Sequence, residues 1–197
     1  GLDIVVVDDG STDDTSGAAE AVGAHVLRHE VNRGKGAALK TGFEYAVERD
    51  YDAVITMDGD GQHDPEAIPD FLEALDRCDA DVIVGTRMHS VGDMPKLRIW
   101  TNRTTSRVVS FLAGQKIPDS QSGYRLIKVE VLKDIVRSLV TSRYDTESEL
   151  LIRAARRGYR TAAVGIKSIY RGTVSHINPF VDTLRFLRLV GRSMFWR

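Results

Sequence analysis

The chain has 197 residues, of which 42% are hydrophobic and 28% are charged, a composition typical of one soluble globular domain. Its formal net charge of -1 provides no overall basic field for nucleic acid. The single cysteine, Cys78, excludes an internal disulfide and a multi-cysteine metal site. The sequence has no apolar run of about 18 residues, so it predicts no transmembrane helix. The first residues do not have the pattern of a signal peptide, and the start at Gly1 leads us to expect a truncated beginning.

The first half of the chain alternates strands and helices. Apolar and β-branched runs predict strands over 2–7, 24–28, 53–57 and 81–85. Helical spacing predicts helices up to about residue 22, over 37–49 and after Pro65. This alternation predicts βαβ units, and therefore an α/β fold with a mostly parallel sheet and helices on both faces.

The second half departs from this alternation. After a loop over 88–96, the sequence predicts helices over 97–112, 129–137 and 146–157, a short strand over 124–127, and an edge strand or strands over 161–170. A polar turn, Asp119 to Arg125, leads into the short strand.

The stretch from Ala53 to Pro65 carries the strongest chemical signal. Its apolar run ends in Asp58-Gly-Asp60, with Gln62 two residues later, at the carboxyl end of a strand, where α/β sheets bind ligands. Two carboxylates and an amide oxygen suit Mg²⁺ or Mn²⁺. The alternative is an acidic surface turn, because Asp-Gly pairs are common in turns.

Residues 179–196 predict a helix of unusual composition. Arg185, Arg188 and Arg192 fall on one narrow stripe, and large apolar residues cover much of the remainder. This pattern is typical of a helix at the surface of an anionic membrane. It also fits a helix docked on the core with its arginines in water. We therefore divide the chain into a domain over 1–178 and an amphipathic helix over 179–197.

Several blocks resemble a known family when taken together. They are Ile4-Val-Val-Val-Asp8-Asp9-Gly-Ser-Thr-Asp13, Asn32-Arg-Gly-Lys-Gly36, Asp58-Gly-Asp60-Gly-Gln62-His-Asp-Pro65, Gly85-Thr-Arg87, Asp119-Ser-Gln-Ser-Gly-Tyr-Arg125, Tyr144-Asp-Thr-Glu147-Ser-Glu149 and Ser175-His-Ile177. Their order and spacing, from residue 2 to about 188, resemble family-2 glycosyltransferases with a GT-A fold, and most closely the polyprenyl-phosphate sugar synthases of the dolichol-phosphate mannose synthase type. Members of this family begin with an earlier strand and a Pro-x-x-Asn-Glu turn. The resemblance therefore implies that the first strand, and one wall of the nucleotide pocket, are missing here.

The resemblance implies an inverting, metal-dependent transfer of a hexose from a nucleotide sugar, of the GDP-mannose or UDP-glucose type, to polyprenyl phosphate. It implies a peripheral enzyme at the cytoplasmic face of a membrane, with Mg²⁺ or Mn²⁺ as cofactor and no nucleic-acid partner. The Gln-x-x-Arg-Trp motif of processive members is absent, which favours single transfer. The alternatives are transfer to a soluble or polysaccharide acceptor, and a nucleotide-binding fragment without turnover.

The resemblance also implies roles for individual residues. Asp58, Asp60 and Gln62 would hold the metal; Asp8 and Asp9 would meet the base or ribose; Lys35 would approach the phosphates; Arg87, Arg98 and Asn102 would face the acceptor phosphate; Asp119, Gln121, Ser122 and Arg125 would flank the reaction centre; and Glu147 would lie near the acceptor. We take Asp60, Arg87, Asp119, Gln121 and Glu147 as the catalytic set.

Each of these roles has a plainer alternative. Asp8 fits a helix cap, Lys35 a solvated turn, and Arg98 a surface cation. The stretch 119–125 fits an ordinary polar turn, and Glu147 an acid favoured in the first turn of a helix.

Overall fold

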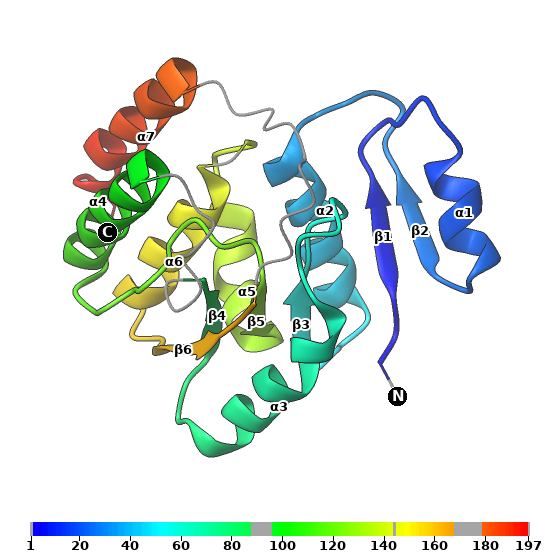
Figure 1. Cartoon of the computed structure of the whole chain (residues 1–197), viewed down its shortest axis with the longest axis horizontal. Helices are drawn as coiled ribbons and strands as arrows, with labels where there is room; N and C mark the ends of the chain where they lie inside the picture. The colour runs from blue at the N-terminus through cyan, green and yellow to red at the C-terminus, as the bar shows by residue number, and fades with distance from the viewer. Residues whose placement is uncertain (1, 88–95, 144, 168–178, 197) are drawn as a thin grey trace.

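The computed structural model describes residues 2–87, 96–143, 145–167 and 179–196, and the side chains of 96–98 and 179–182 are not described. Its elements in chain order are β1 (Val5–Asp8), α1 (Thr15–Ala21), β2 (His25–Arg28), α2 (Lys35–Glu48), β3 (Ala53–Thr56), the 3-10 turn η1 (Pro65–Ala67), α3 (Ile68–Arg77), β4 (Val82–Thr86), α4 (Lys96–Ala113), β5 (Arg125–Lys128), α5 (Val129–Ile135), the 3-10 turn η3 (Val136–Ser138), α6 (Thr146–Arg156), β6 (Thr161–Gly165) and α7 (Pro179–Ser193). Figure 1 shows their arrangement.

Four strands form a mixed sheet in the order β3-β5-β4-β6. β4 and β6 are parallel neighbours, whereas β5 runs antiparallel to both β3 and β4. The predicted α/β class is confirmed, and β5 is the strand that departs from parallel. Because β5 runs backward, its first residue, Arg125, pairs with Thr56 and Val84 near the carboxyl ends of their strands. The polar turn before β5 is thereby brought to the edge where Asp58 lies.

Helices cover both faces of this sheet, as the sequence predicts. Side chains alternate along the buried strand β4, since successive residues of a strand point to opposite faces. Val82 and Val84 pack into a large cluster with side chains of α2, α4, α5 and α6. Ile83 packs in a smaller cluster with Phe71 of α3. The sheet is therefore the middle layer of a three-layer domain.

β1 and β2 form a separate parallel pair, with α1 beside them (Figure 1). Among the described residues, β1 shares no sheet with β3. Leu2 and Ile4, at the start of this pair, are 63% and 62% exposed. The absence of a first strand stays a prediction from the family resemblance.

Several boundaries differ from the predicted ones. Helix α2 begins at Lys35, so this residue belongs to a helical first turn and not to the glycine-rich turn before it. Strand β6 ends at Gly165, and the remainder of the predicted edge segment, from residue 168, lies outside the described residues, as do Tyr144 and the block Ser175-His-Ile177. Asp64 and Pro65 begin a helical segment as predicted, because the Asp64 carboxylate accepts the Glu66 N–H.

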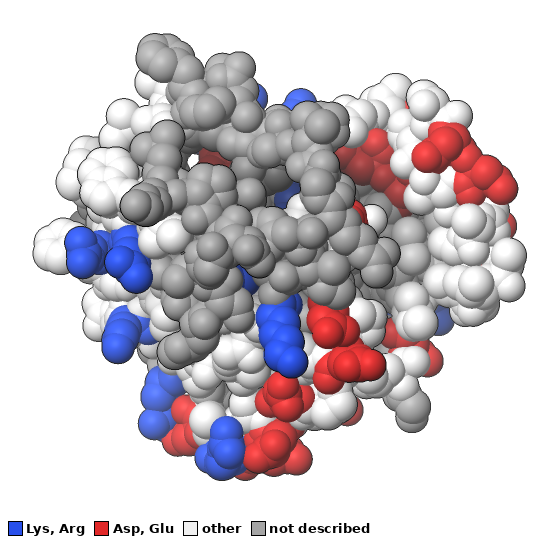
Figure 2. Space-filling model, viewed as in Figure 1, with Lys and Arg blue, Asp and Glu red and all other residues white. Residues whose placement is uncertain are grey.

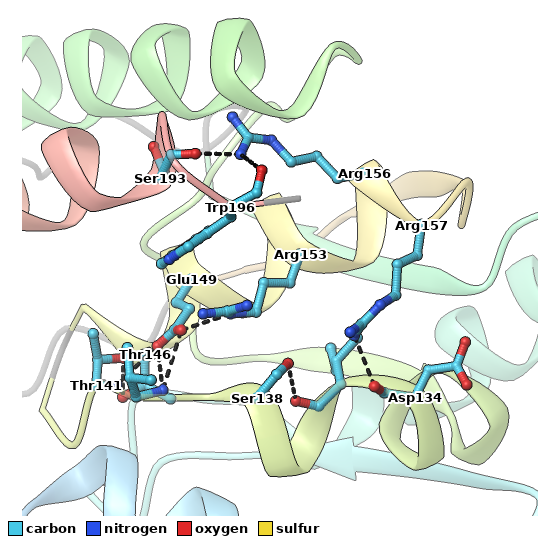
Figure 3. Close-up of polar contacts among 12 residues, drawn as sticks. Asp134, Ser138, Thr141, Thr146, Glu149, Arg153, Arg156, Arg157, Ser193 and Trp196 are labelled. Atoms are coloured by element: carbon cyan, nitrogen blue, oxygen red, sulfur yellow. Dashed lines mark hydrogen bonds and ion pairs between the residues drawn. The ribbon is translucent and has the colours of Figure 1, made fainter.

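Helix α7 is fastened to α6 at its carboxyl end (Figure 3). The Arg156 guanidinium donates to the carbonyls of Ser193 and Trp196. The Arg153 guanidinium lies 3.9 Å from the centre of the Trp196 ring, a cation–π contact. Leu189 is 1% exposed. These contacts dock the carboxyl end of α7 on the core, and the membrane-interfacial role of this helix stays a prediction.

Charge is unevenly distributed over the surface. Figure 2 shows Asp and Glu side chains over the upper right, where Figure 1 places α1, and Lys and Arg side chains on the left, where α4 lies. Among the described residues, no helix is long and apolar enough to cross a membrane.

Candidate active site

The turn after β3 folds back on itself and holds its carboxylates in place. The Asp58 N–H donates to His63 Nδ1 at 2.9 Å, and the Gln62 N–H donates to the Asp60 carboxylate at 3.0 Å. Gly61 has a φ of +72°, which glycine adopts without strain. His63 is a site residue that the sequence analysis did not identify, and it shapes this turn through its ring nitrogen.

The His63 ring is held as a neutral acceptor. It is 7% exposed and stacks on the Tyr124 ring with centroids 5.0 Å apart. Burial lowers the pKa of His63 and outweighs the nearby carboxylates of Asp58 and Asp60, which raise it. Since Nδ1 accepts from Asp58, the ring proton belongs on Nε2.

The end of β3 lies directly against the start of β5. The Thr56 hydroxyl donates to the Gly123 carbonyl at 2.7 Å. A Cβ at Gly123 would stand 2.7 Å from the Asp58 carboxylate, closer than real side-chain carbons approach. A side chain at position 123 would therefore displace the Asp58 carboxylate from its place beside this turn.

Lys35 joins Asp58 to Glu147. Its ammonium lies 2.6 Å from Asp58 Oδ1 and 3.1 Å from Glu147 Oε1. Burial alone would lower the pKa of Lys35, but the Glu147 and Asp58 carboxylates raise it above its usual value. The ammonium stays charged and links the turn after β3 to the first turn of α6.

The glycines beside Lys35 allow this link. Gly34 has a φ of +99°, and a Cβ on Gly36 would collide with Thr146 Oγ1 and with the backbone at Ser142. The start of α2 thus packs directly on the start of α6. The sequence predicts the Gly-Lys-Gly segment as a turn. In the structure its glycines allow the backbone of α2 to lie close to the segment that begins α6.

Asp8 and Asp9 are both engaged by the protein. Asp9 accepts the Arg33 N–H at 2.9 Å and the Gly34 N–H at 2.7 Å, and it lies 2.7 Å from His29 Nδ1. It therefore shapes the glycine-rich turn that positions Lys35.

Asp8 is buried at the end of β1. It accepts the Ser16 hydroxyl and, at 2.8 Å, the Ser11 N–H. These hydrogen bonds lower its pKa to about 2. Asp8 is not the N-cap of α1, which is Asp14, but its contacts fasten the loop after β1 to the first turn of that helix.

The second half of the site is a buried ion pair. Arg87, after β4, donates to both oxygens of Asp119, Nε at 3.0 Å and Nη2 at 3.2 Å. Asp119 is 1% exposed and also accepts the Gln121 N–H at 3.3 Å. This two-pronged geometry fixes the guanidinium plane.

Asn102 is 4% exposed on the buried side of α4. Arg98 lies on the same helix, but its side chain is outside the described residues. The Ser106 hydroxyl of α4 accepts the Ser120 N–H at 3.0 Å, which fastens this helix to the turn that contains Asp119.

Arg125 serves the scaffold. It is 2% exposed, and its donors are directed to the carbonyls of Ser122, Glu147 and Ser120 at 2.7–2.8 Å. It ties the 119–123 turn to the first turn of α6. The family resemblance placed Arg125 among the residues that flank the reaction centre, whereas its three donors in the structure bind backbone carbonyls.

The donor set after β3 fits a divalent ion that is shared with a ligand. Asp58, Asp60 and Gln62 offer the oxygen atoms that Mg²⁺ and Mn²⁺ prefer. In the part of the chain that the structure describes, no group of three or more His, Cys, Asp or Glu side chains could hold a metal. The ion would therefore need further oxygens from water or a phosphate.

Comparison with known proteins places these features in a family. Residues 1–136 match the family model described as glycosyl transferase family 2. The chain is 34% identical over 178 residues to an undecaprenyl-phosphate mannosyltransferase of Micrococcus luteus, covering 86% of this chain and 72% of the relative. It is 35% identical over 173 residues to a polyprenol monophosphomannose synthase of Mycolicibacterium smegmatis, covering 83% and 65%.

A solved structure shares the fold. It is glucosyl-3-phosphoglycerate synthase from Mycobacterium tuberculosis, in complex with Mn²⁺, uridine diphosphate and phosphoglyceric acid. The TM-score is 0.69 at 22% identity, and the match covers 98% of this chain and 66% of that one. At this identity the likeness concerns the fold, and it confirms the predicted GT-A type.

Proposed function

The chain belongs to glycosyl transferase family 2 and is a glycosyltransferase; we propose that it transfers a hexose from a nucleotide sugar to a polyprenyl phosphate. The observation that carries this proposal is the meeting of two turns at one edge of the sheet. Asp58 lies against Gly123, so the candidate metal carboxylates adjoin the 119–123 turn. Asp119 of this turn binds Arg87, which follows β4. A donor diphosphate and an acceptor phosphate would bind on these two sides.

On the donor side, Asp58, Asp60 and Gln62 would hold Mg²⁺ or Mn²⁺. Such an ion, when bound, neutralises charge on a departing nucleoside diphosphate. The protein contributes a turn whose backbone is held by His63 and whose Asp58 carboxylate is paired with Lys35. Lys35 supplies a second positive charge beside Asp58, within reach of the same phosphates.

On the acceptor side, Arg87 and Asn102 would bind the lipid phosphate, together with Arg98. Asp119 holds the Arg87 guanidinium in a fixed plane, which suits phosphate oxygens. A phosphate oxygen is already anionic near neutral pH, so the reaction needs positioning more than a strong general base. In-line attack by this oxygen would invert the anomeric carbon.

The acceptor class is supported by the relatives. Two of them are named for transfer of mannose to undecaprenyl phosphate or polyprenol phosphate. We propose only a hexose for this chain and not mannose, because the structural neighbour binds uridine diphosphate and so points to a UDP-linked sugar as a second type of donor. GDP-mannose and UDP-glucose are therefore the two donors to compare first.

A peripheral position on a membrane is supported by α7. While Leu189 faces the core, Leu184, Leu187, Met194 and Phe195 are 59%, 59%, 67% and 84% exposed. Arg188 and Arg192 are exposed on the same helix. A docked helix that also presents apolar side chains beside arginines matches an interfacial helix. We place it at the cytoplasmic face, where the lipid acceptor would be met.

The proposal is tested with labelled GDP-mannose and UDP-glucose, Mn²⁺ and either polyprenyl phosphate or simple sugars. We expect label in the organic-extractable lipid fraction with one donor. Label only in water-soluble sugars would favour a soluble acceptor. Mn²⁺-dependent nucleotide binding without any transfer would favour a binding module.

A further inference from the structure

Helix α4 has two faces of different chemistry. Its inner face is buried at Asn102, Thr105, Ser106, Val109 and Ala113, the spacing of one helical stripe. Its outer face carries Trp100 and Phe111, which are 66% and 85% exposed. Arg103 and Arg107 are exposed between these aromatic residues. An aromatic residue at each end of an arginine pair is not explained by packing, because neither aromatic side chain is buried.

A hollow of about 720 Å³ runs along this helix and the 114–118 segment. Arg103, Arg107 and Lys116 line it, with Phe111, Ile117 and Pro118. We call it the α4 groove. Its volume suits a small polar group with part of an apolar body.

The polar neutral side chains along the groove are already used by the protein. The Ser110 hydroxyl donates to the Ser106 carbonyl at 2.7 Å and accepts the Ile117 N–H at 2.9 Å. Gln115 donates to the Tyr159 carbonyl and accepts the Thr161 N–H, both at 2.9 Å. These side chains shape the groove and leave recognition to its cations.

The three cations have no acidic partner among the residues that the structure describes. Within the described ranges, no ion pair involves Arg103, Arg107 or Lys116. On the side where α4 lies, Figure 2 shows Lys and Arg without Asp or Glu beside them. The charge of the groove is therefore complementary to an anion. The exposed side chains of Trp100 and Phe111 are suited to an apolar medium.

We propose that the α4 groove binds the phosphate headgroup of an anionic phospholipid, with Trp100 and Phe111 entering the membrane interface. Arginine forks match phosphate oxygens, and aromatic side chains favour the level of the headgroups. This inference rests on the proposed lipid-phosphate acceptor for its biological meaning. The bilayer phospholipid is a different ligand from that acceptor, and Arg103 and Arg107, which would bind it, lie on the face of the helix opposite to Asn102.

This placement gives the groove a role in catalysis. The inner face of α4 carries Asn102 and contacts the 119–123 turn, which contains Asp119, through the hydrogen bond between Ser106 and Ser120. A helix with its side chains is about 10 Å across, so headgroup binding on the outer face would set the height of Asp119 above the bilayer. The enzyme would then meet its lipid-linked acceptor at the right depth.

The test is flotation of the full chain with vesicles of phosphatidylcholine alone or with 30% phosphatidylglycerol (about a third anionic lipid, as a strong surface potential requires). Arg103→Glu/Arg107→Glu should lose about tenfold or more of the binding to anionic vesicles. A milder pair, Arg103→Gln/Arg107→Gln, guards against a folding defect. Trp100→Ser/Phe111→Ser should weaken binding at high salt, where electrostatic attraction is screened.

Arg77→Glu/Arg137→Glu is the matched control, since it makes the same charge change on exposed residues of α3 and η3. Equal losses in the control and the groove variants would overturn the proposal, as would equal binding to both vesicle types. So would binding that depends only on Leu187 of α7 and on Phe195, which follows this helix. Because no donor is present, vesicle binding is measured independently of transfer. Transfer to detergent-dispersed polyprenyl phosphate, unchanged in the groove variants, tests the proposed function separately.

Discussion

The Lys35 ammonium lies 2.6 Å from Asp58 Oδ1 while it also pairs with Glu147 at 3.1 Å. One cation therefore serves a carboxylate proposed to hold a metal and a buried carboxylate at the start of α6. Lys35 and a divalent ion would both bind the Asp58 carboxylate, and two positive charges near one carboxylate repel each other. This relationship predicts competition between them.

Lys35→Met should raise the affinity for Mn²⁺ alone by about fivefold, since removing a nearby positive charge is worth on the order of 1 kcal/mol in a half-buried site. It should at the same time lower transfer about tenfold or more through the lost phosphate contact. Titration calorimetry with Mn²⁺ measures the first effect and a donor assay the second. Lys40→Met, one helical turn on in α2, is the control. Unchanged Mn²⁺ affinity in Lys35→Met would rule out the competition.

Asp60→Ala should abolish Mn²⁺-dependent donor binding and reduce transfer by about a hundredfold or more, because it removes a proposed metal oxygen. Asp60 is exposed, and its carboxylate accepts the Gln62 N–H. The free energy of unfolding should therefore change by only about 0.5 kcal/mol. Donor binding is measured by calorimetry with and without Mn²⁺. Retention of Mn²⁺-dependent binding would contradict the metal assignment.

Arg125→Lys should destabilise the fold by about 3 kcal/mol, because an ammonium cannot reach the three buried carbonyls and those left unpaired cost free energy. Urea unfolding gives the change in free energy. Arg87→Lys is the comparison, since Arg87 is bound to Asp119 and its loss should fall mainly on transfer. If the Arg125→Lys variant kept normal stability but lost acceptor binding, Arg125 would be a substrate-binding residue and not a scaffold residue.

Gly36→Ala should lower both stability and transfer, because the new Cβ collides with Thr146 Oγ1 and pushes α2 away from α6. Gly42→Ala, in the same helix, has Val7 Cγ2 at 3.4 Å as its nearest neighbour. Alanine is the better helix former by about 1 kcal/mol, so this control should be neutral or stabilising. Thermal unfolding and transfer assays separate the two variants. Equal behaviour would mean that the close approach at Gly36 is not needed.

Asp8 should contribute an acid-dependent part of the stability. Its pKa of about 2 lies below the usual value of 3.8 because it accepts bonds from Ser16 and Ser11. A lowered carboxyl pKa stabilises the fold above the unfolded pKa, and this contribution is lost as pH falls through the folded pKa. The stability difference between the wild type and Asp8→Asn should shrink as pH falls from about 4 to about 2. Urea unfolding across this range is the measurement, and a difference independent of pH would count against it.

The strand before Asp58 and the helix start at Asp64 and Pro65 were predictable from the sequence. Apolar runs and capping residues act over a few neighbouring positions, so local order is enough to reveal them. The family blocks likewise predicted the GT-A type fold. The metal-type oxygens followed from residue chemistry at the end of a strand.

Only the tertiary structure decided how these pieces meet. The direction of β5, the contact of Gly123 with Asp58 and the bridge from Lys35 to Glu147 join segments far apart in the chain, where sequence spacing carries no distance. The partners of the side chains separated Arg125, which binds three backbone carbonyls, from Arg87, which binds the Asp119 carboxylate, although both are buried arginines beside polar turns. Packing also showed that α7 is docked on the core through Leu189, while Leu184 and, just after the helix, Phe195 are exposed. Residue type determined what each side chain can do, and the packing around it determined which of those roles it has.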